Sequence, residues 1–505
     1  MQTVVDPKTL LLQRIEDKTA LVGVVGMGYV GLPFAVEKAK VGYRVVGIDR
    51  SAKRVAMINQ GQNYIGDVKD EELRDLVAHG LIRATTGFEE VPELDVIVIA
   101  VPTPLTKNLV PDLQYVEGVT REIAKYLRPG QLVSLESTTY PGTTEEVMLP
   151  ILEQSGLKLN QDFFLAHSPE RVDPGNARYT TKNTNKVVGG VGPQSLEVAV
   201  AFYSKTINHV VPVSSAKAAE MVKVFENTFR AVNIALVNEL AMLCDRLGLN
   251  VWEDLDAAFT KPFGILPFYP GPGVGGHCIP IDPHYLEWKA KEVNFNTHFI
   301  ALVNELTLLC DRMDLNVWEV LDAAFTKPFG IMPFYPGPGV GGHCIPLDPH
   351  YLEWKAKEYN FNTHFINLAG EINRKMPEFT VDKAARVLSQ HGKPLRGAKV
   401  VLLGMAYKAN LDDYRESPAI EVFKLLQKRG AEVVFHDSWT PHVEEHGFVA
   451  DSVELTDELL QNADLVIITT NHKNVDYARV VALSKVVLDT RYATRGIKAD
   501  NVVLL

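Results

Sequence analysis

The chain lacks a long apolar stretch: no run in its 505 residues reaches the roughly 18–20 apolar residues that a membrane-spanning helix needs. Its N-terminus has no basic segment followed by an apolar core, so we expect no secretory signal. Positive charge is not in excess either, because the formal net charge is −11. This balance argues against a general binder of nucleic acid or membrane surfaces. These absences predict a cytoplasmic protein with neither membrane nor nucleic acid among its partners.

Cysteine is scarce, with four residues that form two equivalent pairs of positions. Cys244 and Cys310 fall in apolar helical sequence, whereas Cys278 and Cys344 fall in Gly/Pro-rich loops. The even number therefore carries no information about disulfides, and a reducing compartment is expected. His277 precedes Cys278 and is a candidate base, although neighbours on a loop usually point apart. The His–Cys spacing matches no common zinc site, so we predict no metal.

The cysteines come in pairs because part of the chain is present twice. Residues 235–300 are followed at once by residues 301–366, and the two copies differ at 8 of 66 positions. Each copy holds a helical segment, the loop FYPGPGVGGHCIP and a helical DPHYLEWKAKE. Half a helix and a loop have no core of their own, so this repeat is not a solenoid.

The length predicts two to three domains. In the first third and at the C-terminal end, short apolar runs alternate with helical patterns, which indicates parallel sheets covered by helices. The middle holds one long apolar helix from about Ala216 to Leu247, with Ser214 or Ser215 as its N-cap. We predict an α/β chain with an N-terminal Rossmann domain over residues 1–212, a central helical region over 213–378 and a Rossmann-like domain over 379–505.

The long helix is apolar on most of its faces. A helix of this kind is buried, either in a large core or against a partner chain. We therefore expect a homodimer or a larger homo-oligomer formed through this helix.

A glycine motif, Gly26-x-Gly28-x-x-Gly31, follows the first predicted strand and opens a helix. The next strand ends in Asp49, 18 residues beyond Gly31, which is typical of a dinucleotide site. The glycines allow a tight turn, close approach to a pyrophosphate and close helix packing, while the helix N-terminus supplies N–H donors. Asp49 is expected to accept from ribose hydroxyls, which favours NAD, although Arg50 leaves NADP open. The predicted cofactor-binding residues are Gly26, Gly28, Tyr29, Val30, Gly31, Asp49 and Arg50.

Three sets of side chains suggest chemistry. The thiols Cys278 and Cys344 stand among glycines, where a sulfur stays accessible as a nucleophile for an aldehyde carbonyl. Lys223 and Asn227 lie one turn apart on an apolar helix, which suits a polar ligand unless the lysine reaches solvent. Glu170 follows an apolar run, so it lies either at the ligand-binding edge of a sheet or on the surface.

These motifs together resemble the UDP-glucose/GDP-mannose dehydrogenase family. The likeness rests on VGVVGMGYVGLP, VPTPL, ESTTYPGTT, SPERVDPG, AAEMVKVFENTFRAVNIALVNELA, GGHCIPID and GMAYKANLDDYRESPA, in family order over nearly the whole chain. It implies an NAD-dependent four-electron oxidation of the primary alcohol of a UDP-sugar to a carboxylate, with the C-terminal domain binding UDP. Without one copy the chain would have 439 residues (505 less 66), an ordinary length for the family. The repeat is thus a departure from it.

The resemblance also implies roles for single residues. The loop cysteine adds to the sugar aldehyde as a thiohemiacetal, and a second hydride transfer gives a thioester that water hydrolyses. Lys223 and Asn227 stabilise developing oxyanions, and Glu170 acts as acid or base in the hydrolysis. Other roles carried over are water activation by Thr138 with Asp282 or Asp348, a cofactor contact by Thr103, and pyrophosphate binding by Lys408, Arg415 and Arg491.

The sequence of the loop also narrows, by resemblance, the class of sugar that the substrate carries. Enzymes for UDP-glucose usually carry Ser before the cysteine and Lys before the aspartate, where this chain has His277 and Ile281. The loop is more similar to enzymes for UDP-N-acetylhexosamines, with UDP-N-acetylglucosamine first and UDP-N-acetylmannosamine or UDP-glucose as alternatives. Two further hypotheses stay open: an impaired binder of NAD and UDP-sugar, and a simple two-electron dehydrogenase.

The two copies compete for one site, because Glu170, Lys223 and Asn227 occur once. The first copy continues the long helix, which favours Cys278. The second leads into NLAGEINRKMP, the normal continuation in the family, which favours Cys344. A mixed fold, with the helix of the first copy and the loop of the second, satisfies both ends. We predict that the first copy keeps the helix and supplies Cys278, while the displaced copy exposes apolar side chains.

Overall fold

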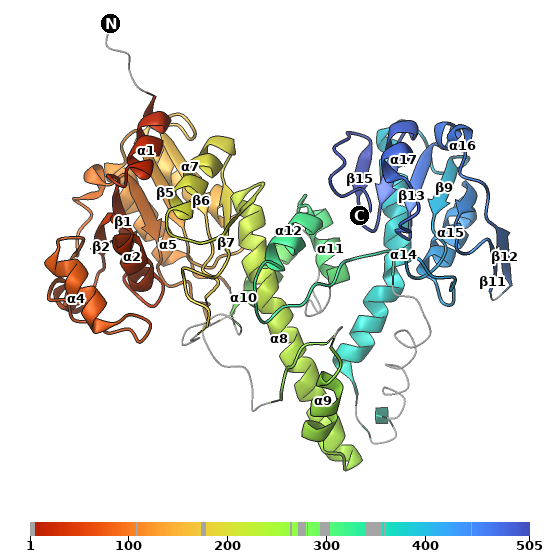
Figure 1. Cartoon of the computed structure of the whole chain (residues 1–505), viewed down its shortest axis with the longest axis horizontal. Coiled ribbons are helices and arrows are strands. Elements are labelled where there is room, and N and C mark those ends of the chain that lie inside the picture. The colour runs from red at the N-terminus through yellow and green to blue at the C-terminus, as the bar shows by residue number, and fades with distance from the viewer. Residues whose placement is uncertain are drawn as a thin grey trace, which may run out of the picture. The chain divides into compact units, whose positions relative to one another are not determined.

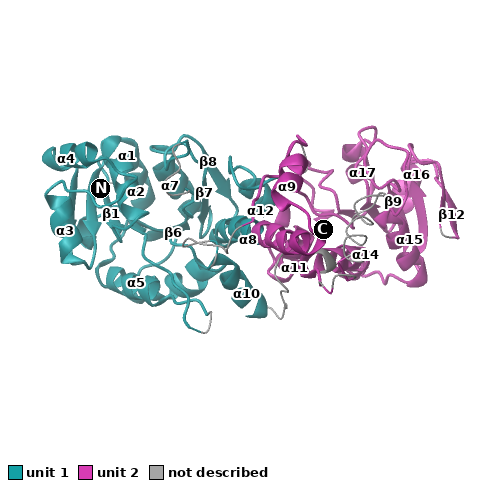
Figure 2. Cartoon of the chain, turned by 90° about the horizontal axis from the view of Figure 1, so that it is seen from below, with its two compact units in different colours: residues 1–231, 273–299, 319–332 teal, residues 232–272, 300–318, 333–505 magenta. Residues whose placement is uncertain are grey.

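The structure is a computed structural model that describes residues 6–107, 110–172, 178–262, 265–270, 279, 281–292, 303–339, 356–357, 360, 362–445 and 447–505. The chain forms two compact units, coloured separately in Figure 2. Unit 1 comprises residues 1–231, 273–299 and 319–332, and unit 2 comprises residues 232–272, 300–318 and 333–505. Both units take segments from both copies of the repeat, so neither copy folds as one block.

Unit 1 is built on an eight-stranded sheet in the order β3-β2-β1-β4-β5-β6-β7-β8. All neighbouring strands are parallel except β6 and β7. The order reverses between β1 and β4, which is where doubly wound sheets bind their ligands. The strands are β1 (Leu21–Val25), β2 (Arg44–Ile48), β3 (Ile82–Thr85), β4 (Val96–Ile99), β5 (Gln131–Leu135), β6 (Phe163–His167), β7 (Lys186–Gly190) and β8 (Val210–Val213).

Helices cover this sheet, and α1 precedes its first strand (Figure 1). The α-helices are α1 (Pro7–Glu16), α2 (Gly31–Lys40), α3 (Ala52–Asn59), α4 (Asp70–Ala78), α5 (Gln114–Tyr126), α6 (Leu149–Leu152), α7 (Pro193–Ser204) and α10 (Asp282–Glu292). Single turns of other helix types are η1 (Val91–Glu93), η2 (Thr144–Met148) and η3 (Glu153–Ser155).

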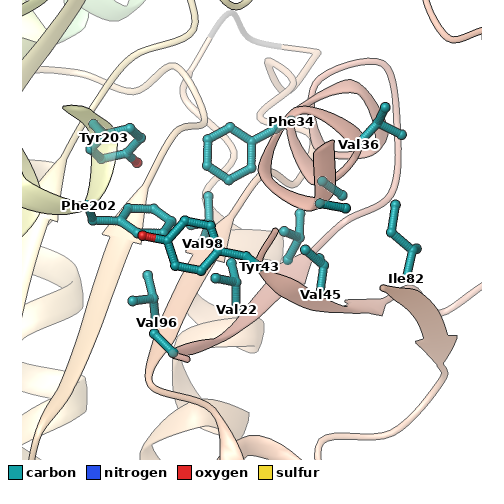
Figure 3. Close-up of a cluster of buried hydrophobic side chains, with 14 of the residues drawn as sticks. Val22, Phe34, Val36, Tyr43, Val45, Ile82, Val96, Val98, Phe202 and Tyr203 are labelled. Atoms are coloured by element: carbon teal, nitrogen blue, oxygen red, sulfur yellow. The ribbon is translucent and has the colours of Figure 1, made fainter. Parts of the chain in front are cut away.

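Both faces of the sheet are buried, which explains why its strands read as continuous apolar runs. Along β4, Val96 and Val98 belong to the cluster on one face, and Ile97 and Ile99 to the cluster on the other. Figure 3 shows the first cluster, in which aromatic rings from α2 and α7 lie over β1 and β4.

The long helix α8 runs over Ala216–Leu247, as the sequence predicts. The Ser215 hydroxyl caps it by accepting a hydrogen bond from the Ala218 N–H at 3.1 Å. The helix passes without a break from unique sequence into the first copy, which therefore keeps the helix. Within the described residues, no helix is both long and apolar enough to cross a membrane.

Unit 2 carries a parallel five-stranded sheet in the order β10-β9-β13-β14-β15 and an antiparallel pair, β11-β12. Its strands are β9 (Lys399–Leu403), β10 (Glu432–His436), β11 (His442–Glu445), β12 (Phe448–Asp451), β13 (Leu465–Ile468), β14 (Val487–Asp489) and β15 (Val502–Leu504). The helices that begin in it are α9 (Val251–Phe259), α11 (Val303–Arg312), α12 (Val317–Ala324), α14 (His364–Gln390), α15 (Pro418–Lys428), α16 (Asp457–Asn462) and α17 (Tyr477–Leu483). The predicted α/β architecture is thus confirmed at both ends of the chain.

The two copies begin with the same local fold. The turn after α8 has Gly248 in the left-handed region (φ 69°), and the turn after α11 has Asp314 there (φ 54°). The next helix starts in each copy with an asparagine cap: Asn250 accepts from the N–H two residues on at 3.2 Å, and Asn316 does so at 3.1 Å. Asparagine and aspartate side chains favour such turns and caps, so local sequence accounts for this repeated helix–turn–helix.

Candidate active site

The glycine motif forms a tight turn between β1 and α2. Gly26 has φ 92°, and a Cβ there would lie 2.4 Å from the Ala100 carbonyl oxygen. A Cβ on Gly31 would lie 1.9 Å from the Gly26 carbonyl oxygen, whereas a Cβ on Gly28 would meet nothing within 4 Å. Packing therefore demands glycine at Gly26 and Gly31, while Gly28 borders open space at the N-terminus of α2. This is the geometry that holds the pyrophosphate of NAD in such sheets.

Asp49 is buried beside this turn at the end of β2 (6% exposed). Its carboxylate accepts from the Met27 N–H at 3.0 Å and from the Ser51 N–H at 2.8 Å, which fixes the glycine turn. The guanidinium of Arg50 lies 5.1 Å from the centre of the Tyr115 ring.

The other predicted cofactor residues follow the ends of neighbouring strands. Tyr29, 69% exposed, and Val30 lie in the turn after β1. Thr103 follows β4, and its carbonyl oxygen accepts from the Tyr285 hydroxyl at 3.0 Å. Because β1, β2 and β4 are parallel, these residues share one edge of the sheet with Asp49.

One face of α8 carries buried polar side chains: Lys223, Glu226 and Asn227 are 5%, 0% and 1% exposed. The Asn227 amide donates a hydrogen bond to the carboxylate of Asp282, the first residue of α10. Asp282 belongs to the first copy. The sequence predicted roles for Asn227 and for a loop aspartate but not this hydrogen bond between them, and the aspartate that makes it comes from the first copy.

Asp282 has an altered acidity. Burial raises the pKa of its carboxyl group to about 6, even though Lys223 and the Asn227 hydrogen bond act in the opposite direction. A carboxyl group with a pKa near neutrality is well matched to taking a proton from water at physiological pH.

Glu170 is held in place by three donors. One carboxylate oxygen accepts from the N–H groups of Arg171 and Val172, both at 2.9 Å, and the other accepts from Lys186 at 3.0 Å. Burial pushes the pKa of Glu170 upward, but Lys186 and the Val172 N–H together bring it below its usual value. Glu170 is therefore a carboxylate at neutral pH, which suits a base and not an acid.

Behind Glu170 runs a chain of buried polar groups. The ammonium group of Lys186 also binds Glu136 at 3.1 Å, and Glu136 accepts from the Tyr203 hydroxyl at 3.0 Å. The Tyr203 hydroxyl in turn pairs with that of Ser134 at 2.8 Å. Burial raises the pKa of Glu136, and Lys186 acts against this rise while it also lowers the pKa of the neighbouring Glu170.

A second buried ion-pair group joins α8 to the second copy. The Glu226 carboxylate binds Arg171 at 2.6 Å and Lys327 at 3.0 Å, and all three side chains are buried. Burial lowers the pKa of Lys327, and Glu226 acts against this. The polar cluster of unit 1 thus takes Asp282 from the first copy and Lys327 from the second. Both copies thus contribute to the cluster, in a division that differs from the mixed alternative of a first-copy helix with a second-copy loop.

Several predicted residues cannot be placed. Cys278, Cys344, Asp348 and His277 lie outside the described residues. Asp282, four residues after Cys278, is described and lies in unit 1. Thr138 follows β5 and is partly exposed.

The three predicted pyrophosphate ligands lie after strands of the unit 2 sheet. Lys408 and Arg415 are exposed after β9, and the Arg415 guanidinium makes two bonds to Asp413 at 2.9 and 2.6 Å. Arg491 follows β14, donates to the Thr469 carbonyl oxygen at 2.9 Å, and has its pKa lowered to about 10 by burial. Since β9 and β14 are parallel, all three residues belong to one edge of that sheet.

Sequence reasoning did not single out five charged residues of the site. These residues are Glu136, Arg171, Lys186, Glu226 and Lys327. Three of them could have been found, because a charged residue inside a strand or helix that is otherwise buried needs a partner. Lys186 is the first residue of the strand KVVGG, Glu136 directly follows the strand QLVSL, and Glu226 lies within the apolar helix α8. Arg171 and Lys327 stand in loops, where charge gives no such signal.

Profiles of the UDP-glucose/GDP-mannose dehydrogenase family match most of the chain. The NAD binding domain profile matches residues 20–207, and the UDP binding domain profile matches residues 401–496. The central domain profile matches twice, at residues 217–301 and 294–375, in step with the two copies.

Relatives match along most of the chain. NDP-N-acetyl-D-galactosaminuronic acid dehydrogenase of Ralstonia nicotianae is 32% identical over 93% of this chain and 95% of its own. UDP-N-acetyl-D-glucosamine 6-dehydrogenase of Pseudomonas aeruginosa is 32% identical over 84% of this chain and 83% of its own. The solved structure of UDP-D-ManNAc dehydrogenase from Pyrococcus horikoshii is 29% identical, with a TM-score of 0.51 over 96% and 98% of the two chains.

The glycine turn offers a matched pair of variants. Gly31→Ala forces a methyl group against the Gly26 carbonyl oxygen, so it should destabilise the protein by about 1–3 kcal/mol. Gly28→Ala meets no atom and should change stability by less than about 0.5 kcal/mol, yet weaken NAD binding because its methyl group faces the pyrophosphate. Urea denaturation and calorimetric titration with NAD measure the two effects. Unchanged NAD affinity in Gly28→Ala would place the cofactor elsewhere.

Lys186 should be costly to remove. Lys186→Met leaves Glu136 buried without its cation, so we expect a loss of about 3–5 kcal/mol in the free energy of unfolding. Adding Glu136→Gln removes the orphaned charge and should restore part of that loss. Chemical denaturation of both variants measures this, and equal stability of single and double variants would refute the bridging role.

Proposed function

The chain belongs to the UDP-glucose/GDP-mannose dehydrogenase family, and on that premise we propose that it oxidises a UDP-N-acetylhexosamine to the uronic acid. UDP-N-acetylglucosamine is the leading substrate, since His277 and Ile281 depart from the pattern of the UDP-glucose enzymes. Relatives named for N-acetylated sugars support this class. The observation that carries the proposal is the buried bond between Asn227 and Asp282, with Lys223 beside them and Glu170 within electrostatic reach of Lys223.

The residues of unit 1 take different roles in two successive oxidations. NAD bound at the glycine turn supplies the hydride acceptor for each of them. Lys223 and Asn227 stabilise the negative charge that develops on the sugar oxygen. Cys278 adds its thiolate to the aldehyde carbon, and the resulting thiohemiacetal is the species oxidised to a thioester.

Hydrolysis of the thioester needs an activated water. Asp282 takes the proton of the attacking water, because its raised pKa fits that transfer and Asn227 orients its carboxylate. Thr138 holds the same water. Glu170 is the second base, fixed in the ionised state by Lys186.

The first copy supplies the nucleophile in this proposal. Asp282 is four residues from Cys278 and occupies the place beside Asn227, which supports the first copy as the source of the nucleophile. Lys408, Arg415 and Arg491 hold the nucleotide pyrophosphate, as the family resemblance implies. In addition, Leu236 and Met242 of α8 are 38% and 55% exposed, which supports a homo-oligomer formed through this helix.

The product ratio tests the reaction. Incubation with UDP-N-acetylglucosamine should give two NADH for each sugar consumed, followed by absorbance and by chromatography of the uronic acid. UDP-N-acetylmannosamine, UDP-N-acetylgalactosamine and UDP-glucose serve as comparison substrates. One NADH with release of aldehyde would overturn the thioester mechanism, and NAD binding without NADH from any of them would leave only a binding protein.

The turnover rate should depend on pH through the ionisation of Asp282. The carboxylate form is the active one, so turnover should fall about tenfold per pH unit below about 6. Asp282→Asn should lower turnover about 10²–10⁴-fold and remove this acidic limb, whereas Asp348→Asn, in the other copy, should behave like the wild type. A pH–rate profile of the three proteins decides, and an unaltered limb in Asp282→Asn would assign it to another group.

The two thiols form the second matched pair. Cys278→Ser should abolish formation of the uronic acid, because serine cannot form the thioester, and Cys344→Ser should leave it intact. Carboxylate formation is measured at saturating NAD. The reverse result would move the catalytic loop to the second copy.

A further inference from the structure

The repeat gives the chain two nearly identical segments for one docking position on unit 1. The docked segment, residues 319–332 of the second copy, is part of unit 1. The equivalent exposed segment, residues 253–262 of the first copy, belongs to unit 2. Residues 251–265 and 317–331 differ at a single position, which is Asp254 in one and Val320 in the other.

The docked segment is held by polar contacts along its length. Glu319 accepts from the N–H and hydroxyl of Ser214 at 2.7 and 2.6 Å. Thr326 accepts from Arg171 at 2.9 Å through its hydroxyl and from Asn185 at 2.8 Å through its carbonyl. Lys327 forms an ion pair with Glu226 at 3.0 Å. The three residues that the docked segment contributes to this set, Glu319, Thr326 and Lys327, each have an identical counterpart in the first copy.

The equivalent side chains of the first copy, Glu253, Thr260 and Lys261, are exposed. The contacts with Ser214, Arg171, Asn185 and Glu226 therefore do not distinguish the copies. Over the docked segment the copies differ at two positions, Asp254 against Val320 and Leu266 against Met332, and only the first of these differences changes charge.

The surroundings of these two residues differ sharply. Val320 is 0% exposed on α12. Asp254 is exposed on α9, where its carboxylate accepts from the Cys244 thiol at 3.8 Å. If the first copy docked in the same way, a carboxylate would take the fully buried place of Val320. Burying a carboxylate without a partner is strongly unfavourable.

We propose that this residue pair selects the copy that docks on unit 1: Val320 admits the second copy, and Asp254 excludes the first. The selection decides which lysine pairs with Glu226 and leaves the first copy's α9 on the surface. It concerns the assembly of the fold and does not depend on the proposed reaction.

Lysine acetylation followed by mass spectrometry tests the selection in the intact chain. In the wild type, Lys327 should react at least about tenfold more slowly than Lys261, since it is buried in an ion pair. The tryptic peptides that carry the two lysines have different masses because the copies differ at positions 247, 248, 254 and 266 of the first copy. In Asp254→Val/Val320→Asp the protection should move to Lys261.

Single variants complete the test. Val320→Ala should keep Lys327 protected, because it removes volume without adding charge, whereas Val320→Asp should expose Lys327. Asp254→Val should fold and give partial protection of both lysines, since the two segments then compete as equals. Wild-type protection in both Val320→Asp and Asp254→Val would overturn the proposal, and so would a folded double variant that still protects Lys327. Such results would show that chain connectivity, and not this side chain, selects the copy.

Discussion

The buried carboxylate of Glu226 is the constraint on which the arrangement of unit 1 depends. A carboxylate with no exposed surface is tolerated only with partners, and it has two: Arg171 and Lys327. Arg171 directly follows Glu170, and Glu226 lies next to Asn227 on α8. One ion-pair group therefore fixes the loop that carries one candidate base and the helix that orients the other. It does so only when a lysine from the repeat is present.

The two candidate bases differ because their surroundings differ. Asp282 has one amide donor and the more distant Lys223, so burial dominates and its pKa rises to about 6. Glu170 has Lys186 and two N–H donors, so its pKa falls below its usual value. When the surroundings of two carboxyl groups push their pKa values apart in this way, the two groups can take different proton-transfer roles within one site. Here Glu170 has its pKa lowered and stays ionised at neutral pH, as a base must, whereas the protonation of Asp282 changes near pH 6.

Much of the fold follows from the sequence. Apolar runs that end in turn residues predicted strands in both sheets, and the glycine motif with Asp49 predicted the turn at the sheet edge. The Ser215 cap and the continuous apolar pattern predicted α8 to its last residue. The separate roles of Asn227 and of a loop aspartate came from family resemblance, and the hydrogen bond between them was not predicted. Lys186, Glu136 and Glu226 could have been suspected as charges in buried elements, but their partners could not be predicted, because pairing between β7, β5 and loops distant in sequence is set by tertiary packing.

The repeat shows where local sequence stops determining structure. Both copies form the same helix–turn–helix, with the same left-handed turn and the same asparagine cap. The local sequence therefore determines this part of the structure. The surroundings then diverge: Trp252 is 52% exposed, and its equivalent Trp318 is 1% exposed. Nearly identical segments in one chain cannot differ in propensity, so the difference comes from what each can bury. The chain therefore uses α8 and Asp282 of the first copy together with Lys327 of the second. In this way one polar cluster on unit 1 is completed by residues from both copies of the repeat.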